Sequence, residues 1–137
     1  MTTLSPEEIR ALSDALDDEY KSYATYAQVI ADFGAQRPFI NIVQAEERHF
    51  SALLSLFATY GITPPSDRWR GNAPHFASLH AACVAAVQGE IDNVAIYDRV
   101  LNSTTRPDIL RVYNALREAS LDRHLPAFRR CADRQTA

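Results

Sequence analysis

Residues 39–60 read FINIVQAEERHFSALLSLFATY, and this stretch decides the fold. Its large apolar side chains recur every three or four residues, a spacing typical of a helix that buries one face. One acidic residue, Glu46, interrupts this apolar seam, and His49 follows three residues later on its flank. Residues three apart lie on the same side of a helix, so both side chains can reach one ion. The stretch therefore predicts a buried helix with a carboxylate–imidazole pair at its middle.

Start and stop signals predict four helices, over residues 6–33, 38–60, 75–101 and 107–132. Ser5 and Glu8 form a capping box at the start of the first helix. Gly34 and Gly61 end the first and second helices, because glycine readily adopts the left-handed conformation of a helix C-terminus. Pro126 lies inside the fourth helix and is expected to kink it or to end it early.

The connection between the second and third predicted helices is long. Residues 62–74 are rich in proline and turn-forming residues, and Trp69 is expected to pin this loop to the bundle. At about 3.3 Å per residue the loop spans roughly 45 Å, whereas a helix of about 25 residues is roughly 38 Å long. A crossover of this kind is typical of ferritin-like bundles. We therefore predict an all-α, ferritin-like four-helix bundle that forms a single domain over residues 1–137; the alternative is a flexible loop.

The other apolar seams carry polar residues at matching depth. Glu19 interrupts the first seam, Glu90 interrupts the third, and His124 lies on the fourth. At about 1.5 Å rise per residue, these residues fall within roughly two turns of Glu46 and His49. A lone buried carboxylate costs several kcal/mol unless it is paired or binds a metal, and a divalent cation relieves repulsion between converging carboxylates. We predict a metal site; a buried polar network without metal is the alternative.

The composition excludes other classes of function. Lys and Arg number 14 against 17 Asp and Glu, and the resulting net charge of −3 gives no electrostatic footprint for nucleic acid. No apolar run approaches the ~18 residues of a membrane span, and residues 1–8 lack the features of a signal peptide. Cys83 and Cys131 are the only cysteines, and we expect them to be free thiols in a reducing, cytoplasmic compartment.

Short segments of the chain match a known pattern: Asp18–Lys21, Phe39–Ile42, Ala45–His49, Gly89–Asp92 and His124–Phe128. In order and spacing they resemble the DUF2202 family of ferritin-like proteins, distant relatives of rubrerythrins and ferritins. The resemblance implies non-haem iron, mono- or dinuclear, or alternatively manganese or zinc, held between the helices. By position it implies five ligands: Glu19, Glu46, His49, Glu90 and His124. A rubrerythrin-like site has a second Glu-x-x-His on the fourth helix, where this chain has Leu121 in place of the carboxylate.

Two functions of different classes follow from these patterns. In the first, a redox-active iron or manganese reacts with oxygen or peroxide, with Glu46 and Glu90 as bridging ligands and the other three as terminal ones. In the second, the bundle serves metal sequestration or assembly and its site is inert, which Leu121 favours.

Other seam and surface residues support weaker expectations. Tyr23, Tyr26 and Tyr97 lie on the seams near the predicted site and are expected to be core residues, with hydrogen bonding to the ligands or electron transfer as the alternative. A homodimer is expected through apolar residues off the seams, which are Tyr20, Val43, Leu54 and Val84.

Overall fold

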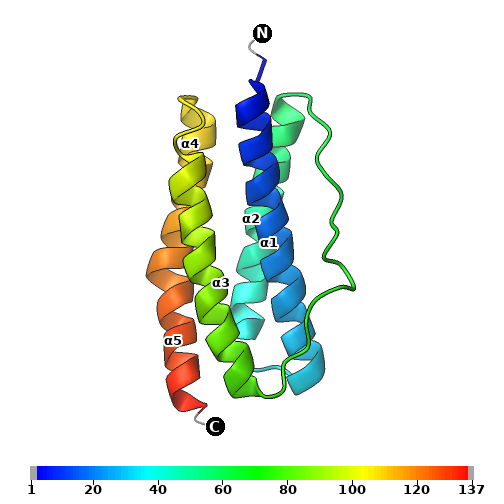
Figure 1. The fold of residues 1–137 in the computed structure, drawn as a ribbon, viewed down its shortest axis with the longest axis vertical. Helices are drawn as coiled ribbons and strands as arrows, with labels where there is room; N and C mark the ends of the chain where they lie inside the picture. Colours follow the sequence, from blue (N-terminus) through cyan, green and yellow to red (C-terminus); the bar gives the residue numbers. More distant parts are fainter. Residues whose placement is uncertain (1–2, 136–137) are drawn as a thin grey trace.

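The computed structural model describes residues 3–135, and within that range it contains helices and loops but no strand. The elements are α1 (Pro6–Phe33), α2 (Phe39–Thr59), α3 (Leu79–Val100), α4 (Pro107–Ala119), a π-helical turn (Ser120–His124) and α5 (Leu125–Arg134). α4, the π turn and α5 follow one another without a break and form the fourth member of a bundle (Figure 1). The predicted all-α four-helix bundle is confirmed. The single-domain assignment stays a prediction, and residues 1–2 and 136–137 lie outside the described residues.

The crossover between α2 and α3 runs along the outside of the bundle (Figure 1). It leaves the end where α2 finishes and reaches the opposite end, where α3 begins, so α2 and α3 run in the same direction. The loop is fixed to α1 at Asp17, which accepts two hydrogen bonds from Arg68, at 2.7 and 2.9 Å, and one from Trp69 Nε1 at 3.1 Å. These contacts confirm that Trp69 pins the crossover and rule out a loop without fixed contacts.

Most predicted helix boundaries are confirmed by the local chemistry. Ser5 and Glu8 form both bonds of the capping box, and Gly34 and Gly61 have φ values of 86° and 67°. The third helix differs, because α3 begins at Leu79 rather than at residue 75. Ser78 Oγ accepts a hydrogen bond from the backbone N–H of Ala81. This cap stabilises a later start than the one predicted after Pro74.

The fourth helix is neither ended nor simply kinked at Pro126. It widens into the π turn, where the Leu125 N–H donates to the Ser120 carbonyl five residues earlier. Proline lacks an N–H, and its ring crowds the carbonyl four residues earlier, so the wider turn accommodates Pro126 without ending the helix. At the two ends of the turn Ser120 and His124 face the core, with exposures of 1% and 4%, whereas Leu121 is 36% exposed.

Two apolar clusters fill the bundle and leave a polar zone between them. One cluster includes Leu12, Leu16, Leu53, Tyr97 and Tyr113. The other includes Tyr26, Phe39, Val29, Ala86 and Phe128. None of the described helices is long and apolar enough to cross a membrane.

The apolar residues proposed for a dimer contact are mostly not exposed. Val84 is 49% exposed, but Tyr20, Val43 and Leu54 are half-buried and pack against the two core clusters. They lie at the flanks of the seams, where neighbouring helices cover them. The homodimer stays a prediction, with less surface to support it.

The prediction of free thiols is wrong. Cys83 on α3 and Cys131 on α5 form a disulfide, with a Cα–Cα distance of 5.7 Å. Both cysteines are fully buried, and α3 and α5 pack side by side (Figure 1). Cysteine spacing in a sequence does not show which side chains meet, and here the packing of two helices brings them together. The expected cytoplasmic location loses its premise of free thiols and stays a prediction.

Candidate metal centre

The five residues predicted as ligands meet in the polar zone between the two apolar clusters. Glu19 comes from α1, Glu46 and His49 from α2, Glu90 from α3, and His124 from the π turn. All five side chains are buried, with exposed fractions between 0% and 8%. They form two groups whose ligand atoms lie within 4.8 Å of one another: Glu19, Glu46 and His49 in one, and Glu46, Glu90 and His124 in the other. Glu46 is therefore shared by both groups, whereas Glu90 belongs to one.

Each histidine faces two carboxylates. His49 Nδ1 lies 3.4 Å from Glu19 Oε2 and 3.9 Å from Glu46 Oε2. His124 Nδ1 lies 3.0 Å from Glu46 Oε1 and 3.3 Å from Glu90 Oε1. The two imidazole rings are nearly parallel, with centroids 5.4 Å apart. Each group thus offers one nitrogen and two carboxylate oxygens, a mixed ligand set that suits iron, manganese or zinc.

The atoms that face one another lack hydrogen-bond partners. Among the described residues, these buried unpaired atoms include Glu19 Oε2, Glu46 Oε1, His49 Nδ1, Glu90 Oε1 and His124 Nδ1. The short His124–Glu46 contact has the distance of a hydrogen bond but not its alignment. Buried polar groups are normally satisfied, so a convergent set of unpaired ligand atoms fits a cation at their centre.

The outer oxygens of two of these carboxylates are held by tyrosines. Tyr97 donates a 2.7 Å hydrogen bond to Glu19 Oε1, and Tyr26 donates to Glu90 Oε2. Each carboxylate therefore keeps its other oxygen free and aimed at the cluster. Outer hydrogen bonds of this kind orient metal ligands and tune their basicity. The ligand-bonding role, which the sequence left as an alternative, applies to Tyr26 and Tyr97, while Tyr23 packs edge-on against Phe50.

Two polar residues beside the cluster, Asn93 and Ser120, were not among the residues predicted for the site. Asn93 is 2% exposed, and its amide donates to Glu19 Oε1 at 3.2 Å and to Asp18 Oδ2 at 2.7 Å. Ser120 donates a 2.6 Å hydrogen bond to Asn93 Oδ1. The signal for Asn93 was its place three residues after Glu90, on the same helical face. Ser120 lies on the apolar seam of the fourth helix, four residues before His124, so helical spacing predicted that it faces the core but gave it no role in the site.

The residue that occupies the place of the missing fourth carboxylate is not Leu121. Counting back three residues from His124 leads to Leu121, but Leu121 lies at the surface, and Ser120, four residues before His124, is buried. Ser120 is therefore the residue that faces the cluster. Its hydroxyl is occupied by Asn93, so the fourth helix supplies His124 alone.

Burial and mutual repulsion keep the charge of the cluster low. Burial raises the pKa of Glu46 well above its ordinary value, and the negative charge of Glu19 raises it further. Burial also acts to raise the pKa of Glu19, but the nearby Glu46 carboxyl and His49 imidazole, together with the hydrogen bond from Tyr97, outweigh it and lower that pKa to about 2. Without metal, Glu46 is therefore the carboxyl of this pair that favours the protonated form. A cation that binds here has to displace this proton.

A second acid at the edge of the cluster, Asp18, is partly protonated near neutral pH. Burial raises the pKa of Asp18 to about 7, against the hydrogen bond from Asn93 that lowers it. The charge of Glu19 raises it further. Asp18 thus limits the negative charge that accumulates around Glu19.

Fold and cluster together define a four-helix bundle with buried acidic and histidine groups that could hold a metal. The family described as "Uncharacterized protein domain (DUF2202)" matches residues 16–136, and the chain belongs to this family, as its resemblance predicted.

Solved structures support the fold. A hypothetical protein from Methanococcus jannaschii DSM 2661 superimposes with a TM-score of 0.87 at 21% identity, over 98% of this chain and 84% of that one. A conserved hypothetical protein from Mycobacterium tuberculosis gives a TM-score of 0.82 at 18% identity, over 96% of this chain and 94% of that one. No curated protein matches the chain. At these identities the likeness concerns the fold alone.

Proposed function

We propose that the chain is a non-haem metalloprotein that holds iron or manganese in redox-active form between its helices. The observation that carries the proposal is the convergence of five unpaired, buried ligand atoms from four helical segments. A buried polar network would pair its donors and acceptors internally, and these atoms are left unpaired. Glu46 belongs to both groups of ligands, so Glu19, Glu46 and His49 could hold one ion, and Glu46, Glu90 and His124 could hold a second.

The residues around the cluster suit this role. When bound, iron or manganese supplies a change of redox state and reactivity towards oxygen or peroxide. Glu46 would have to be deprotonated to act as a ligand. Tyr26 and Tyr97 hold Glu90 and Glu19 in orientation, and the apolar clusters on either side keep bulk water away. Each group would supply three protein ligands to an ion.

Elemental analysis and visible spectroscopy of protein purified without added metal test this function. We expect bound iron or manganese and, for iron, a colour that dithionite bleaches. The second candidate function, metal sequestration or assembly with an inert site, is favoured by the absence of a carboxylate on the fourth helix at Ser120. Colourless protein that holds only zinc and is unchanged by dithionite would support that candidate and contradict the redox proposal.

Thermal unfolding of Glu90→Gln with and without metal tests the ligand role directly. A hundredfold excess of metal over its dissociation constant stabilises the folded state by about 2.7 kcal/mol, or roughly 8–11 °C at ~3–4 °C per kcal/mol. In protein kept metal-free with a chelator, Glu90→Gln removes a negative charge that is repelled by the other carboxylates, and it keeps an oxygen that can accept the hydrogen bond from Tyr26. The unfolding midpoint of the variant should therefore equal or exceed that of the wild type. In metal-loaded protein the same change should lower the midpoint. Two results together would favour the buried polar network: a chelator that leaves the unfolding midpoint of the wild type unchanged, and a Glu90→Gln variant whose midpoint is the same with and without metal.

A further inference from the structure

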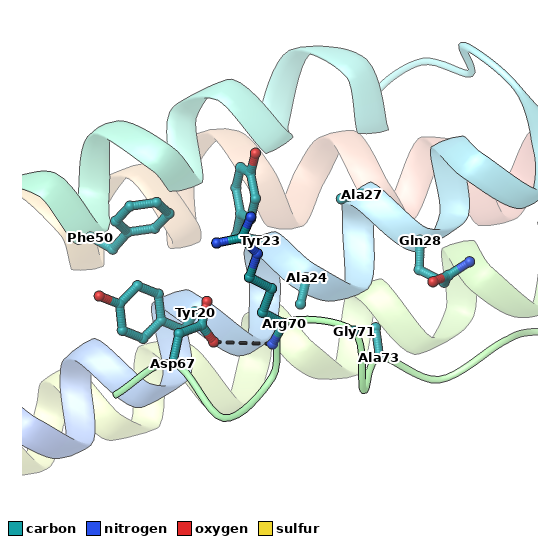
Figure 2. A pocket seen from close by; sticks show the side chains of 10 residues that line it. All are labelled: Tyr20, Tyr23, Ala24, Ala27, Gln28, Phe50, Asp67, Arg70, Gly71 and Ala73. Atoms are coloured by element: carbon teal, nitrogen blue, oxygen red, sulfur yellow. Dashed lines mark hydrogen bonds between the residues drawn. The ribbon is translucent and has the colours of Figure 1, made fainter. Parts of the chain in front are cut away.

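A pocket of about 570 Å³ lies between the crossover loop and α1, and Phe50 of α2 also lines it (Figure 2). Its volume is typical of sites for small organic molecules. Tyr20, Tyr23 and Phe50 form an aromatic side of the pocket. Ala24 and Ala27 follow the tyrosines on the same side of α1, and their small side chains leave the space open.

The aromatic side is fixed by ring packing. The Phe50 ring lies 5.0 Å from the Tyr20 ring and 5.4 Å from the Tyr23 ring, measured between centroids. All three residues are half-buried, so part of each ring is free to meet a ligand. Fixed aromatic rings bind planar rings by stacking or edge contacts. The pocket therefore favours a planar aromatic molecule.

The loop side of the pocket contributes a cation, Arg70, opposite the aromatic side. Asp67 Oδ1 accepts hydrogen bonds from the backbone N–H groups of Trp69, at 2.9 Å, and Arg70, at 3.2 Å. Together with the contacts of Arg68 and Trp69 to Asp17, this turn fixes the backbone at Arg70. The Arg70 side chain extends from the loop towards Tyr23 (Figure 2).

The Arg70 guanidinium has no partner. Among the described residues, Arg68, Arg99, Arg106 and Arg117 form ion pairs with carboxylates, and Arg70 does not. Asp67 lines the same pocket, and its negative charge is partly compensated by the two backbone N–H groups that donate hydrogen bonds to it. A guanidinium in this position suits a carboxylate, which it can bind through two parallel hydrogen bonds.

We propose that this pocket binds a small planar aromatic acid, with its ring against Tyr20, Tyr23 and Phe50 and its carboxylate on Arg70. The site differs from the metal centre, because no residue of the carboxylate–histidine cluster lines the pocket within residues 3–135. Two residues of the pocket are nevertheless next to residues of the metal centre in the chain, since Tyr20 follows Glu19 and Phe50 follows His49. A bound acid would thus rest on the helical turns that hold two of the predicted ligands.

Calorimetric titration of the full chain, kept metal-free with chelator, tests the site. The probes are 2-naphthoate and its uncharged amide, 2-naphthamide, which share ring and shape. Wild-type protein should bind naphthoate about tenfold more tightly than naphthamide, as expected for one charge-assisted contact. Arg70→Gln should remove this difference, and Ala24→Phe should weaken both probes by filling the pocket. Arg130→Gln, an exposed arginine on α5, is the matched control and should change neither affinity.

Helix content and unfolding midpoint of each variant show that it is folded. Equal affinity of the two probes for the wild type, undetectable binding of naphthoate, or an unchanged preference in Arg70→Gln would each overturn the proposal. Because the titration uses metal-free protein, such a result leaves the proposed metal site untouched. Loss of metal binding in other experiments likewise leaves this site untouched.

Discussion

Replacing Glu46 with alanine is expected to lower metal affinity more than roughly 100-fold and to affect every bound ion. Changes to the outer partners of metal ligands already cost 10–100-fold, and Glu46 is itself a member of both groups of ligand atoms. Glu90→Ala and His124→Ala each disrupt one group only. We therefore expect these two variants to retain about half of the wild-type metal, and Glu46→Ala to retain almost none.

Metal content per chain, measured by elemental analysis after dialysis against a fixed free metal concentration, distinguishes these outcomes. Glu47→Ala is the matched control, because Glu47 neighbours Glu46 on α2 but is exposed. Circular dichroism should show intact helices in Glu46→Ala, since the change removes a carboxyl group that is costly to bury. Equal metal loss in Glu46→Ala and Glu47→Ala would place the metal elsewhere.

Replacing Cys83 and Cys131 together with alanine is expected to lower the free energy of unfolding by about 4 kcal/mol. The disulfide closes a loop over a sequence separation of 48 residues, and the chain-entropy estimate for such a loop is roughly 4 kcal/mol. At ~3–4 °C per kcal/mol, the midpoint should fall by roughly 12–16 °C. Reductant should lower the wild-type midpoint in the same direction and leave the double variant unchanged.

Thiol titration of the unfolded chain provides the control for that prediction. Without reductant, the wild type should expose no free thiol, whereas reduced protein should expose both. Two reactive thiols per unreduced chain, together with a double variant as stable as the wild type, would contradict the disulfide. The original expectation of free cysteines would then be the better one.

Local sequence patterns were enough to predict the helices and the depth of the polar residues. The capping box at Ser5 and the glycines at 34 and 61 act through contacts within a few residues. The seam interruptions at Glu19, Glu46 and Glu90 follow from helical periodicity, and all three side chains are buried. These features depend on near neighbours in the chain, so they can be found without knowing how the helices pack.

Tertiary structure decided the features that depend on distant segments. Cys83 and Cys131 meet because α3 and α5 pack together, and Tyr26 and Tyr97 reach Glu90 and Glu19 across the core. No local pattern encodes these distances.

At the π turn, the sequence determined one part of the structure and tertiary packing determined another. The sequence by itself determined that Pro126 disturbs the fourth helix, because proline cannot donate a backbone hydrogen bond. Packing of that helix against α3 decided how the disturbance is accommodated: the helix widens, Ser120 reaches Asn93, and His124 stays in the cluster. One added residue in a turn rotates every later side chain, so the face that α5 presents to the core, with Phe128 and Cys131, depends on how the bundle accommodates the turn.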